Sequence, residues 1–362
     1  MDSLVSIVNV TTVRSAAVLV TSPFGALADG TPVKAHTLSA APDGIQLTVL
    51  DLGATVSSVR MPSPGNAFAD VVLGLGTARD YASPGNPYLG ATVGRYANRI
   101  RGAQFTLDGV RHELAANEGT TCLHGGPDGF SARLWSVVHS DDASVELELE
   151  SPGGDQGFPG ALTARVRYAV DHDTVTIEHR AVTDAPTVVS LTNHAYFDLS
   201  GQGTVEDHWL TVAADAYLPV DGSSIPVGGD EPVEGGPFDF RRAAEIGARV
   251  RSPHPQVRQA AGIDHAYVLR GEGLRLAARL EHPPTGRSLE VSTTQPSVQV
   301  YTGNQLDGTV TDRGGRSLGP RAGIALECQA YPDAPNQPGF PSTVLRLGEE
   351  YSATTVWRFT QQ

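Results

Sequence analysis

The chain has 362 residues and a hydrophobic content of 40%, enough to bury a sizeable core as one large domain or two ordinary ones. Its 40 glycines and 25 prolines exceed the usual combined share of about 12%, which favours many short strands and turns over long helices. The net charge of −14 argues against a nucleic-acid partner, because phosphate backbones are bound by clustered Lys and Arg.

The N-terminal residues predict neither a secretion signal nor a membrane anchor. Apolar residues occur at 5–8 and 16–20, without a basic stretch before them and without one unbroken apolar run. No segment is apolar over a bilayer's thickness, so we expect no membrane partner and a cytoplasmic location. Strong patterning begins at Phe24. Residues 1–23 are therefore expected to form a strand or a loosely attached arm, ahead of a single domain over residues 24–362.

Period-two alternation of apolar and polar residues recurs along the chain. Residues 162–170 and 175–179 alternate in this way on either side of an Asp-His-Asp turn. Asp108-Gly109 lies between Phe105-Thr106-Leu107 and Val110-Arg111-His112 and is a strong hairpin signal. Further strands are expected near residues 45–60, 145–149, 208–218, 265–270, 274–281, 297–302 and 354–360.

Helix signals are few. Residues 240–250 are expected to form a short helix with Asp239 as its N-terminal cap. Residues 221–238 are rich in Gly, Pro and Asp and are expected to form a long surface loop, of the kind that sets the width of a cleft. The pattern as a whole predicts an all-β fold, a large antiparallel β-sandwich with few short helices.

Several short segments combine Gly, Asn, His and aromatic residues, a composition that is unusual for plain strands. They lie at residues 86–90, 94–100, 123–126, 191–197, 236–241, 262–265, 298–304, 326–329 and 332–338. In order and content these segments resemble the aldose 1-epimerase (galactose mutarotase) family, and the resemblance extends from about Phe24 to Phe359. It implies a β-sandwich with an open carbohydrate cleft and an enzyme that interconverts the α and β anomers of a free sugar.

The resemblance also implies an acid and a base. Mutarotation removes the proton of the anomeric hydroxyl, opens the ring with protonation of its oxygen, and recloses the ring on the other face of the aldehyde. The family's catalytic glutamate matches Glu327, whose apolar neighbours indicate a mostly buried strand and a raised carboxyl pKa. The histidine of the family's Thr-Asn-His segment matches His194, and imidazole can give and recover a proton near neutral pH.

Five further residues are expected to bind the sugar. By resemblance His124, ahead of Gly125-Gly126, contacts the sugar near its ring oxygen and is the alternative acid. Arg99 supplies a rigid set of donors beside Asn98, although Arg95, four residues earlier, is an alternative for that role. Asp264 would accept hydroxyl hydrogen bonds, and Gln299 is a weaker candidate.

Each of these residues also has a plainer structural explanation. Glu327 could be an ordinary strand glutamate and His194 a satisfied core histidine. His124 could belong to a turn and an arginine to a surface ion pair. Asp264 could flank a turn, and Gln299 could bond only to neighbouring backbone.

Other kinds of chemistry find little support. Lys34 is the only lysine, which argues against Schiff-base and PLP catalysis. Cys122 and Cys328 form neither a disulfide framework nor a zinc motif, and His172 and His179 lack partners at metal-ligand spacing. We therefore expect no cofactor and no metal.

Three competing functions stay open at this stage. A hexose 6-phosphate epimerase of the same superfamily would require extra cationic groups for the phosphate. A non-catalytic sugar-binding or sensor protein would be expected to lack the acid or the base. A tailoring enzyme for another hemiacetal would use the same pair in a reshaped cleft. The expected partner is a small sugar, and the chain is expected to be a monomer or a homodimer.

Overall fold

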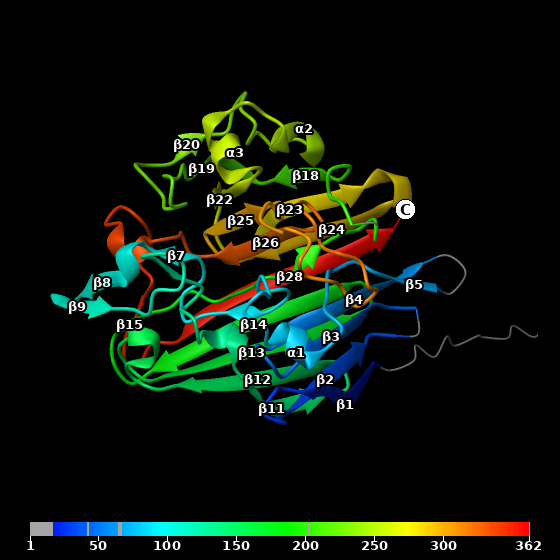
Figure 1. Cartoon of the computed structure of the whole chain (residues 1–362), viewed down its shortest axis with the longest axis horizontal. Coiled ribbons are helices and arrows are strands. Elements are labelled where there is room, and N and C mark those ends of the chain that lie inside the picture. Colours follow the sequence, from blue (N-terminus) through cyan, green and yellow to red (C-terminus); the bar gives the residue numbers. More distant parts are fainter. Residues whose placement is uncertain (1–16, 42, 64–66, 202, 362) are drawn as a thin grey trace, which may run out of the picture.

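The computed structural model describes residues 17–41, 43–63, 67–201 and 203–361. Three antiparallel sheets dominate it (Figure 1). The largest consists, in spatial order, of β11 (Ser136–Asp141), β12 (Ser144–Ser151), β13 (Leu162–Asp171), β14 (Thr174–Thr183), β28 (Tyr351–Gln361), β24 (Arg287–Thr293), β23 (Arg275–His282), β18 (Trp209–Val212) and β21 (Ala244–Glu245). The long strand β28 therefore joins hairpins from the first half of the chain to hairpins from the second half.

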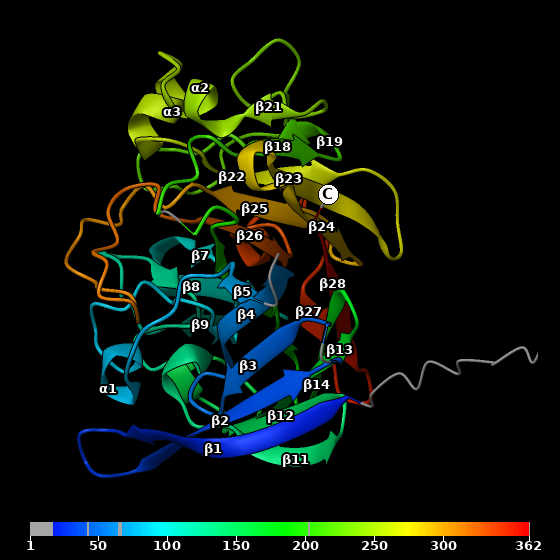
Figure 2. The ribbon, with the colours of Figure 1, turned by 90° about the vertical axis from the view of Figure 1, so that its right-hand side faces the viewer.

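Two smaller sheets cover one face of this large sheet. The six-stranded sheet has the order β17 (Tyr196–Phe197), β26 (Ile324–Gln329), β25 (Ser297–Tyr301), β22 (Asp264–Leu269), β19 (Ala214–Tyr217) and β20 (Glu231–Pro232). The five-stranded sheet runs in chain order through β1 (Val18–Ala26), β2 (Pro32–Ser39), β3 (Gln46–Leu50), β4 (Thr55–Ser63) and β5 (Ala67–Asp70). Figure 2 shows β1 and β11 at one end of the molecule and α2 and α3 at the other.

The remaining elements are short. Four two-stranded ladders pair β7 (Arg99–Ile100) with β10 (Cys122–Leu123), β6 (Thr92–Val93) with β16 (Thr192–Asn193), β15 (Thr187–Val188) with β27 (Val344–Leu345), and β8 (Gln104–Leu107) with β9 (Val110–Glu113). The α-helices of the described residues are α1 (Ala78–Tyr81), α2 (Ile246–Val250) and α3 (Pro255–Ala260). None of them is long and apolar enough to cross a membrane.

The alternation seen in the sequence accounts for the core. In β13 the apolar residues at every second position from Leu162 to Val170 are buried, and they belong to one hydrophobic cluster that also takes in the inner faces of the other two sheets. The predicted all-β sandwich is confirmed. The Asp108-Gly109 hairpin is confirmed as well, with φ of 50° and 81° at these two residues, as a type I′ turn requires.

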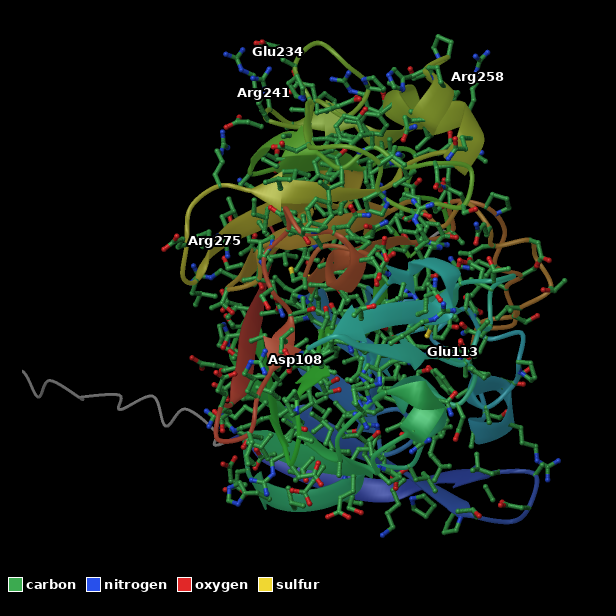
Figure 3. The ribbon with its side chains drawn as sticks, turned by 90° about the vertical axis from the view of Figure 1, so that its left-hand side faces the viewer. Asp108, Glu113, Glu234, Arg241, Arg258 and Arg275 are labelled. Atoms are coloured by element: carbon green, nitrogen blue, oxygen red, sulfur yellow. The ribbon has the colours of Figure 1, made fainter. Side chains whose placement is uncertain are left out.

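The helix expected over 240–250 is wrong for its first half. Only Ile246–Val250 is helical, and Glu245 rather than Asp239 precedes it. Ala244 and Glu245 instead add a short edge strand to β18. The carboxylate of Asp239 is bonded to the Arg241 guanidinium, and Figure 3 shows Arg241 beside Glu234 at the surface of this end of the molecule. Strand pairing with β18 at the edge of the large sheet therefore overrides the local helix preference of these residues.

The expected arm overlaps the first strand. Residues 18–23 belong to β1 and pair with β2, whereas residues 1–16 lie outside the described residues. Residues 221–238 are mostly loop, as expected, apart from the two-residue strand β20. Two helices were not expected, α1 after Thr77 and α3 after His254.

Candidate active site

A pocket of about 280 Å³ lies over the six-stranded sheet, on the face that points away from the large sheet. It brings together six of the seven residues predicted from the sequence. These are Asn98, Arg99, His124, His194, Asp264 and Glu327. The seventh, Gln299, does not line the pocket. The loop 221–238, expected to set the width of the cleft, does not line it either; residues 84–88 and Gln305 do.

Glu327 occupies the middle of β26, a strand that is buried on both faces. Ile324, Leu326 and Cys328 belong to the main core, so the alternation of side chains places Glu327 on the opposite face, toward the pocket. Burial raises the pKa of Glu327 to about 8; the Asp264 carboxylate acts in the same direction and the Arg99 guanidinium opposes it. Its Oε2 atom has no hydrogen-bond partner among the described residues. Glu327 is therefore a buried carboxyl with a free oxygen.

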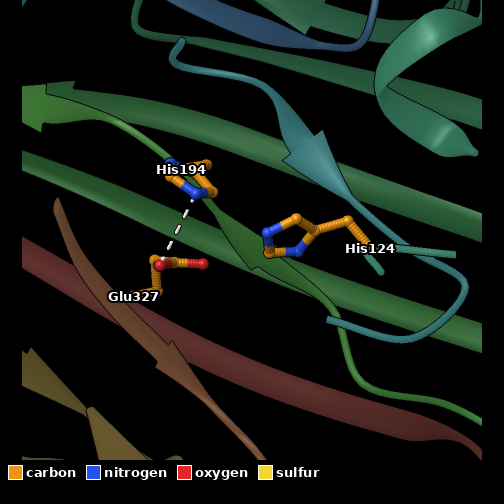
Figure 4. A group of neighbouring side chains, drawn as sticks. All are labelled: His124, His194 and Glu327. Carbon is orange, nitrogen blue, oxygen red and sulfur yellow. Dashed lines mark ion pairs between the residues drawn. The ribbon is translucent and has the colours of Figure 1, made fainter. Parts of the chain in front are cut away.

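His194 lies where the chain passes from β16 to β17. Its backbone N–H donates to Ala91 O at 2.9 Å, and its carbonyl accepts from Gly90 N–H at 2.9 Å. The ring stacks on Tyr196 at a centroid distance of 5.0 Å, and its Nε2 lies 3.6 Å from Glu327 Oε1 (Figure 4). Burial lowers the pKa of His194 to about 4. The backbone and the neighbouring ring thus fix an uncharged imidazole against the carboxyl group.

His124 stands beside this pair, with its ring edge-on to that of His194 at 5.2 Å (Figure 4). Its φ of 52° begins a tight loop that continues through Gly125, where a Cβ atom would lie 2.0 Å from Gly94 O. Its Nδ1 accepts a hydrogen bond from Asn98 N–H at 3.1 Å. The neutral ring therefore carries its proton on Nε2. Burial, together with His194 and Arg99, holds the pKa of His124 well below its usual value.

Arg99 and Asn98 come from the adjacent turn into β7. Nε and Nη2 of Arg99 donate to the two carboxylate oxygens of Glu118 at 2.6 and 2.8 Å. Asn98 has a φ of 66°, and its side-chain oxygen accepts from Arg99 N–H at 2.8 Å. The donors that this turn offers to the pocket are thus the amide NH₂ group of Asn98 and the guanidinium N–H groups of Arg99 that are not bonded to Glu118.

Arg95, the alternative to Arg99, has a different place. It is 2% exposed and donates to the carbonyls of Ser151, Pro159 and Gly160. The side chain therefore ties together two backbone segments, at Ser151 and at Pro159–Gly160, away from the pocket.

Asp264 begins β22, and Gln299 lies on the adjacent strand β25. Gln299 Nε2 donates to Asp264 Oδ1 at 2.6 Å, and strand register sets Gln299 beside Glu327. Burial raises the pKa of Asp264, while Arg99 and the bond from Gln299 oppose the rise. Gln299 points to the same face of the sheet as Glu327 and orients a pocket carboxylate, but it does not line the pocket.

Three tyrosines of the pocket wall were not singled out from the sequence. Tyr88 packs edge-on against His124 at 4.6 Å, Tyr196 stacks on His194, and Tyr301 pairs across the strands with Asp264. Each lies within one of the segments whose composition marked the site. Glu118 was also missed, because it lies outside these segments and belongs to no motif or alternating pattern in the sequence.

The donor set of His124, His194 and Glu327 is that of a His₂Glu zinc site, with the three ligand atoms within 4.8 Å of one another. The tautomer of His124 argues against this use. Its Nδ1 lone pair is taken by Asn98 N–H, so Nε2 bears the proton, whereas metal-bound imidazole normally donates from its other nitrogen. The same three groups suit proton transfer, because a carboxyl and an imidazole in contact can share one proton.

Comparisons with known proteins match most of the chain. A family model described as aldose 1-epimerase matches residues 34–358. The chain is 41% identical over 321 residues to galactose mutarotase of Bos taurus, which covers 88% of this chain and 92% of the relative. It is also 41% identical over 337 residues to aldose 1-epimerase of Escherichia coli K12, which covers 91% and 96%.

Solved structures agree with this result. The galactose 1-epimerase from Lactobacillus acidophilus gives a TM-score of 0.83 at 30% identity and covers 95% of this chain and 99% of that chain. An aldose epimerase homologue from C. elegans gives 0.83 at 29% identity, with coverage of 96% and 99%.

Proposed function

The chain belongs to the aldose 1-epimerase family of isomerases, and we propose that it acts on a free hexose, galactose or glucose, with Glu327 as base and His194 as acid. The observation that carries the assignment of roles is the 3.6 Å contact between His194 Nε2 and Glu327 Oε1 in a buried, polar pocket. Relatives that are named galactose mutarotase support galactose as a substrate.

In the proposed reaction the Glu327 carboxylate takes the proton of the anomeric hydroxyl, and the electrons of that O–H bond form the aldehyde carbonyl. The C1–O5 bond breaks at the same time, and O5 takes a proton from the His194 imidazolium. Rotation about C1–C2 presents the other face of the aldehyde. Ring closure returns the O5 proton to His194, and the new anomeric oxygen recovers its proton from Glu327. No net proton is consumed.

The two pKa values fit this cycle. With the pKa of His194 at about 4 and that of Glu327 at about 8, the pair carries one proton at neutral pH. In the empty pocket that proton resides on Glu327. Its transfer to His194 gives the carboxylate and imidazolium that the reaction needs, and hydroxyl donors of a bound sugar favour the ionised carboxylate.

The remaining groups are assigned to sugar binding. His124 offers its Nε2–H to the ring oxygen, Arg99 and Asn98 donate to hydroxyls, and Asp264 accepts from them. Gln299 acts through Asp264. His124 is the alternative acid, and the experiment below separates it from His194.

The competing functions fit the pocket less well. Among the described residues of the pocket wall, a hexose 6-phosphate would meet a single arginine, Arg99, already paired with Glu118, and two carboxylates, Asp264 and Glu327, so its dianion would be poorly matched. The presence of both catalytic groups in contact disfavours a sensor. A tailoring enzyme for another hemiacetal would show itself by its choice of substrate.

The test is polarimetry of freshly dissolved α-D-galactose, α-D-glucose and α-D-glucose 6-phosphate. We expect the wild type to speed equilibration of the two free hexoses, and Glu327→Gln and His194→Gln to abolish that effect. His124→Gln should keep measurable turnover if His194 is the acid. His139→Gln, on the exposed strand β11, is the control and should match the wild type. No acceleration on either hexose would refute the proposed substrate.

Three broader properties are also proposed. We propose that residues 24–362 form one domain, supported by the largest core cluster, which joins the three sheets. Buried, unpaired Cys122 and Cys328 support a reducing, cytoplasmic compartment. A monomer or homodimer is proposed, and gel filtration with light scattering would decide between them.

A further inference from the structure

Arg99 is the one arginine among the described residues that lines the pocket, and its guanidinium is bonded to Glu118. The two side chains form a bidentate pair, with N–O distances of 2.6 and 2.8 Å. The Arg99 side chain is 8% exposed, whereas that of Glu118 is 38% exposed. We propose that Glu118 is a positioning residue that holds the Arg99 guanidinium in its sugar-binding orientation and keeps it away from the catalytic base; this inference rests on the proposed function.

The short turn that carries Glu118 is itself tightly bonded. Glu118 and Thr121 exchange backbone hydrogen bonds at 3.1 and 2.9 Å. The preceding residue, Asn117, bonds to both the N–H and the carbonyl of Leu123, the neighbour of His124, and its amide also donates to Tyr88 OH at 3.3 Å. The turn therefore connects the segments that carry Tyr88, Arg99 and His124, and Glu118 is anchored well enough to fix an arginine.

Two other carboxylates compete for the same cation. Asp264 and Glu327 both line the pocket, and both act electrostatically on Arg99. A guanidinium that is released from Glu118 would be drawn toward these two carboxylates. That movement would occupy the space of the sugar hydroxyls. It would also stabilise the charged form of Glu327 in the empty enzyme.

The bidentate geometry matters because it fixes direction as well as distance. Two parallel N–H···O bonds lock the plane of the guanidinium, which leaves its remaining N–H donors toward the pocket. A single bond, or a lysine in place of Arg99, would fix a charge without fixing that plane. A side chain that merely stabilised the fold would not link the orientation of Arg99 to substrate affinity.

The experiment compares Glu118→Gln with the wild type in steady-state mutarotation of galactose. We expect KM to rise about 10- to 100-fold and kcat to change less than about threefold, because the bound sugar displaces a misplaced guanidinium. The alkaline limb of the kcat/KM profile should move to lower pH, because an unpaired Arg99 near Glu327 lowers the pKa of that base. Glu118→Asp, which keeps the carboxylate, should recover part of the affinity.

Asp108→Asn is the matched control. Asp108 forms a second bidentate pair, with Arg346 at 2.9 and 2.9 Å, and Figure 3 shows it at the surface in the β8–β9 hairpin. Asn also suits its positive φ. This variant should keep the wild-type KM and pH profile.

The outcomes distinguish a failure of the positioning role of Glu118 from a failure of the proposed function. If the wild type turns over galactose and Glu118→Gln keeps KM and pH profile unchanged, the positioning role is overturned. It is equally overturned if Glu118→Gln loses kcat alone. If Glu118→Gln raises KM just as much in an Arg99→Lys background, Glu118 does not act through Arg99, which also overturns it. A wild type without activity on any hexose refutes the proposed function instead. Thermal melting of each variant identifies a loss that is due to unfolding.

Discussion

Replacing Glu327 by Gln should stabilise the fold in alkaline solution while it abolishes catalysis. Burial raises the pKa of Glu327 from its ordinary 4.5 to about 8, and one pKa unit corresponds to about 1.4 kcal/mol. Between these two pH values the native state holds a proton that the unfolded chain releases, so the free energy of unfolding falls as pH rises. The full loss is about 5 kcal/mol above pH 8, a large part of the roughly 5–15 kcal/mol that stabilises a protein.

The glutamine variant lacks this titration. We therefore expect similar stabilities for the wild type and Glu327→Gln at the acid end of the window, near the ordinary pKa. Above the raised pKa the variant should exceed the wild type by about 5 kcal/mol. Other titrating groups are common to both proteins, so the difference between the two curves isolates this one carboxyl group.

The assay is urea unfolding followed by tryptophan fluorescence across the pH range of the window, with Glu150→Gln as the control. Glu150 is an exposed glutamate on β12, and its replacement should leave the stability difference flat with pH. A stability difference between Glu327→Gln and the wild type that stays constant over the same range would refute the reasoning. It would mean that the carboxylate is ionised without penalty in the folded protein.

Three further predictions concern the same pocket. The pH profile of kcat/KM should be bell-shaped, with limbs near 4 and 8, because the His194–Glu327 pair carries two protons below the first value and none above the second, and the cycle needs the pair with one proton; a flat profile over this range would contradict the proposed proton cycle. Gly125→Ala should lower the free energy of unfolding by more than about 2 kcal/mol, measured by urea titration, since its Cβ would meet Gly94 O and its φ is 87°; wild-type stability would show that the loop can relax. Gln299→Leu should raise KM for galactose about tenfold with a smaller change in kcat, because Asp264 loses its bond from the amide; an equal loss in kcat alone would place Gln299 in the chemical step.

Local sequence preference was sufficient where an element is short and its pattern is strong. The alternation in residues 162–170 and the Asp108-Gly109 turn each specify a strand or a hairpin without help from distant parts of the chain. The same reasoning was wrong for 240–245, whose residues are good helix formers. There Ala244 and Glu245 find hydrogen-bond partners on β18, more than thirty residues earlier in the sequence, and sequence patterning contains no information about that distant edge.

Some features of the candidate site could likewise be predicted from the sequence, and others could not. The proposed acid, base and binding residues followed from the resemblance of short segments, and the structure brings all of them except Gln299 to the pocket wall. The rim formed by residues 84–88 and the partner of Arg99 did not follow. Glu118 is an unremarkable glutamate in a turn until β7 pairs with β10, which sets Arg99 opposite Leu123 and lets its guanidinium reach Glu118.

By itself, the sequence determined the class of fold and the chemical types available for catalysis, because alternation, turns and motifs are encoded by near neighbours. The tertiary structure alone decided the distances, tautomer and pKa values. The contact joins His194 and Glu327, which are far apart in the chain. The proton position on His124 depends on the hydrogen bond from Asn98 N–H. The raised pKa of Glu327 depends on its burial within the packed structure. Proton transfer requires such contacts, and they exist only after the sheets have packed.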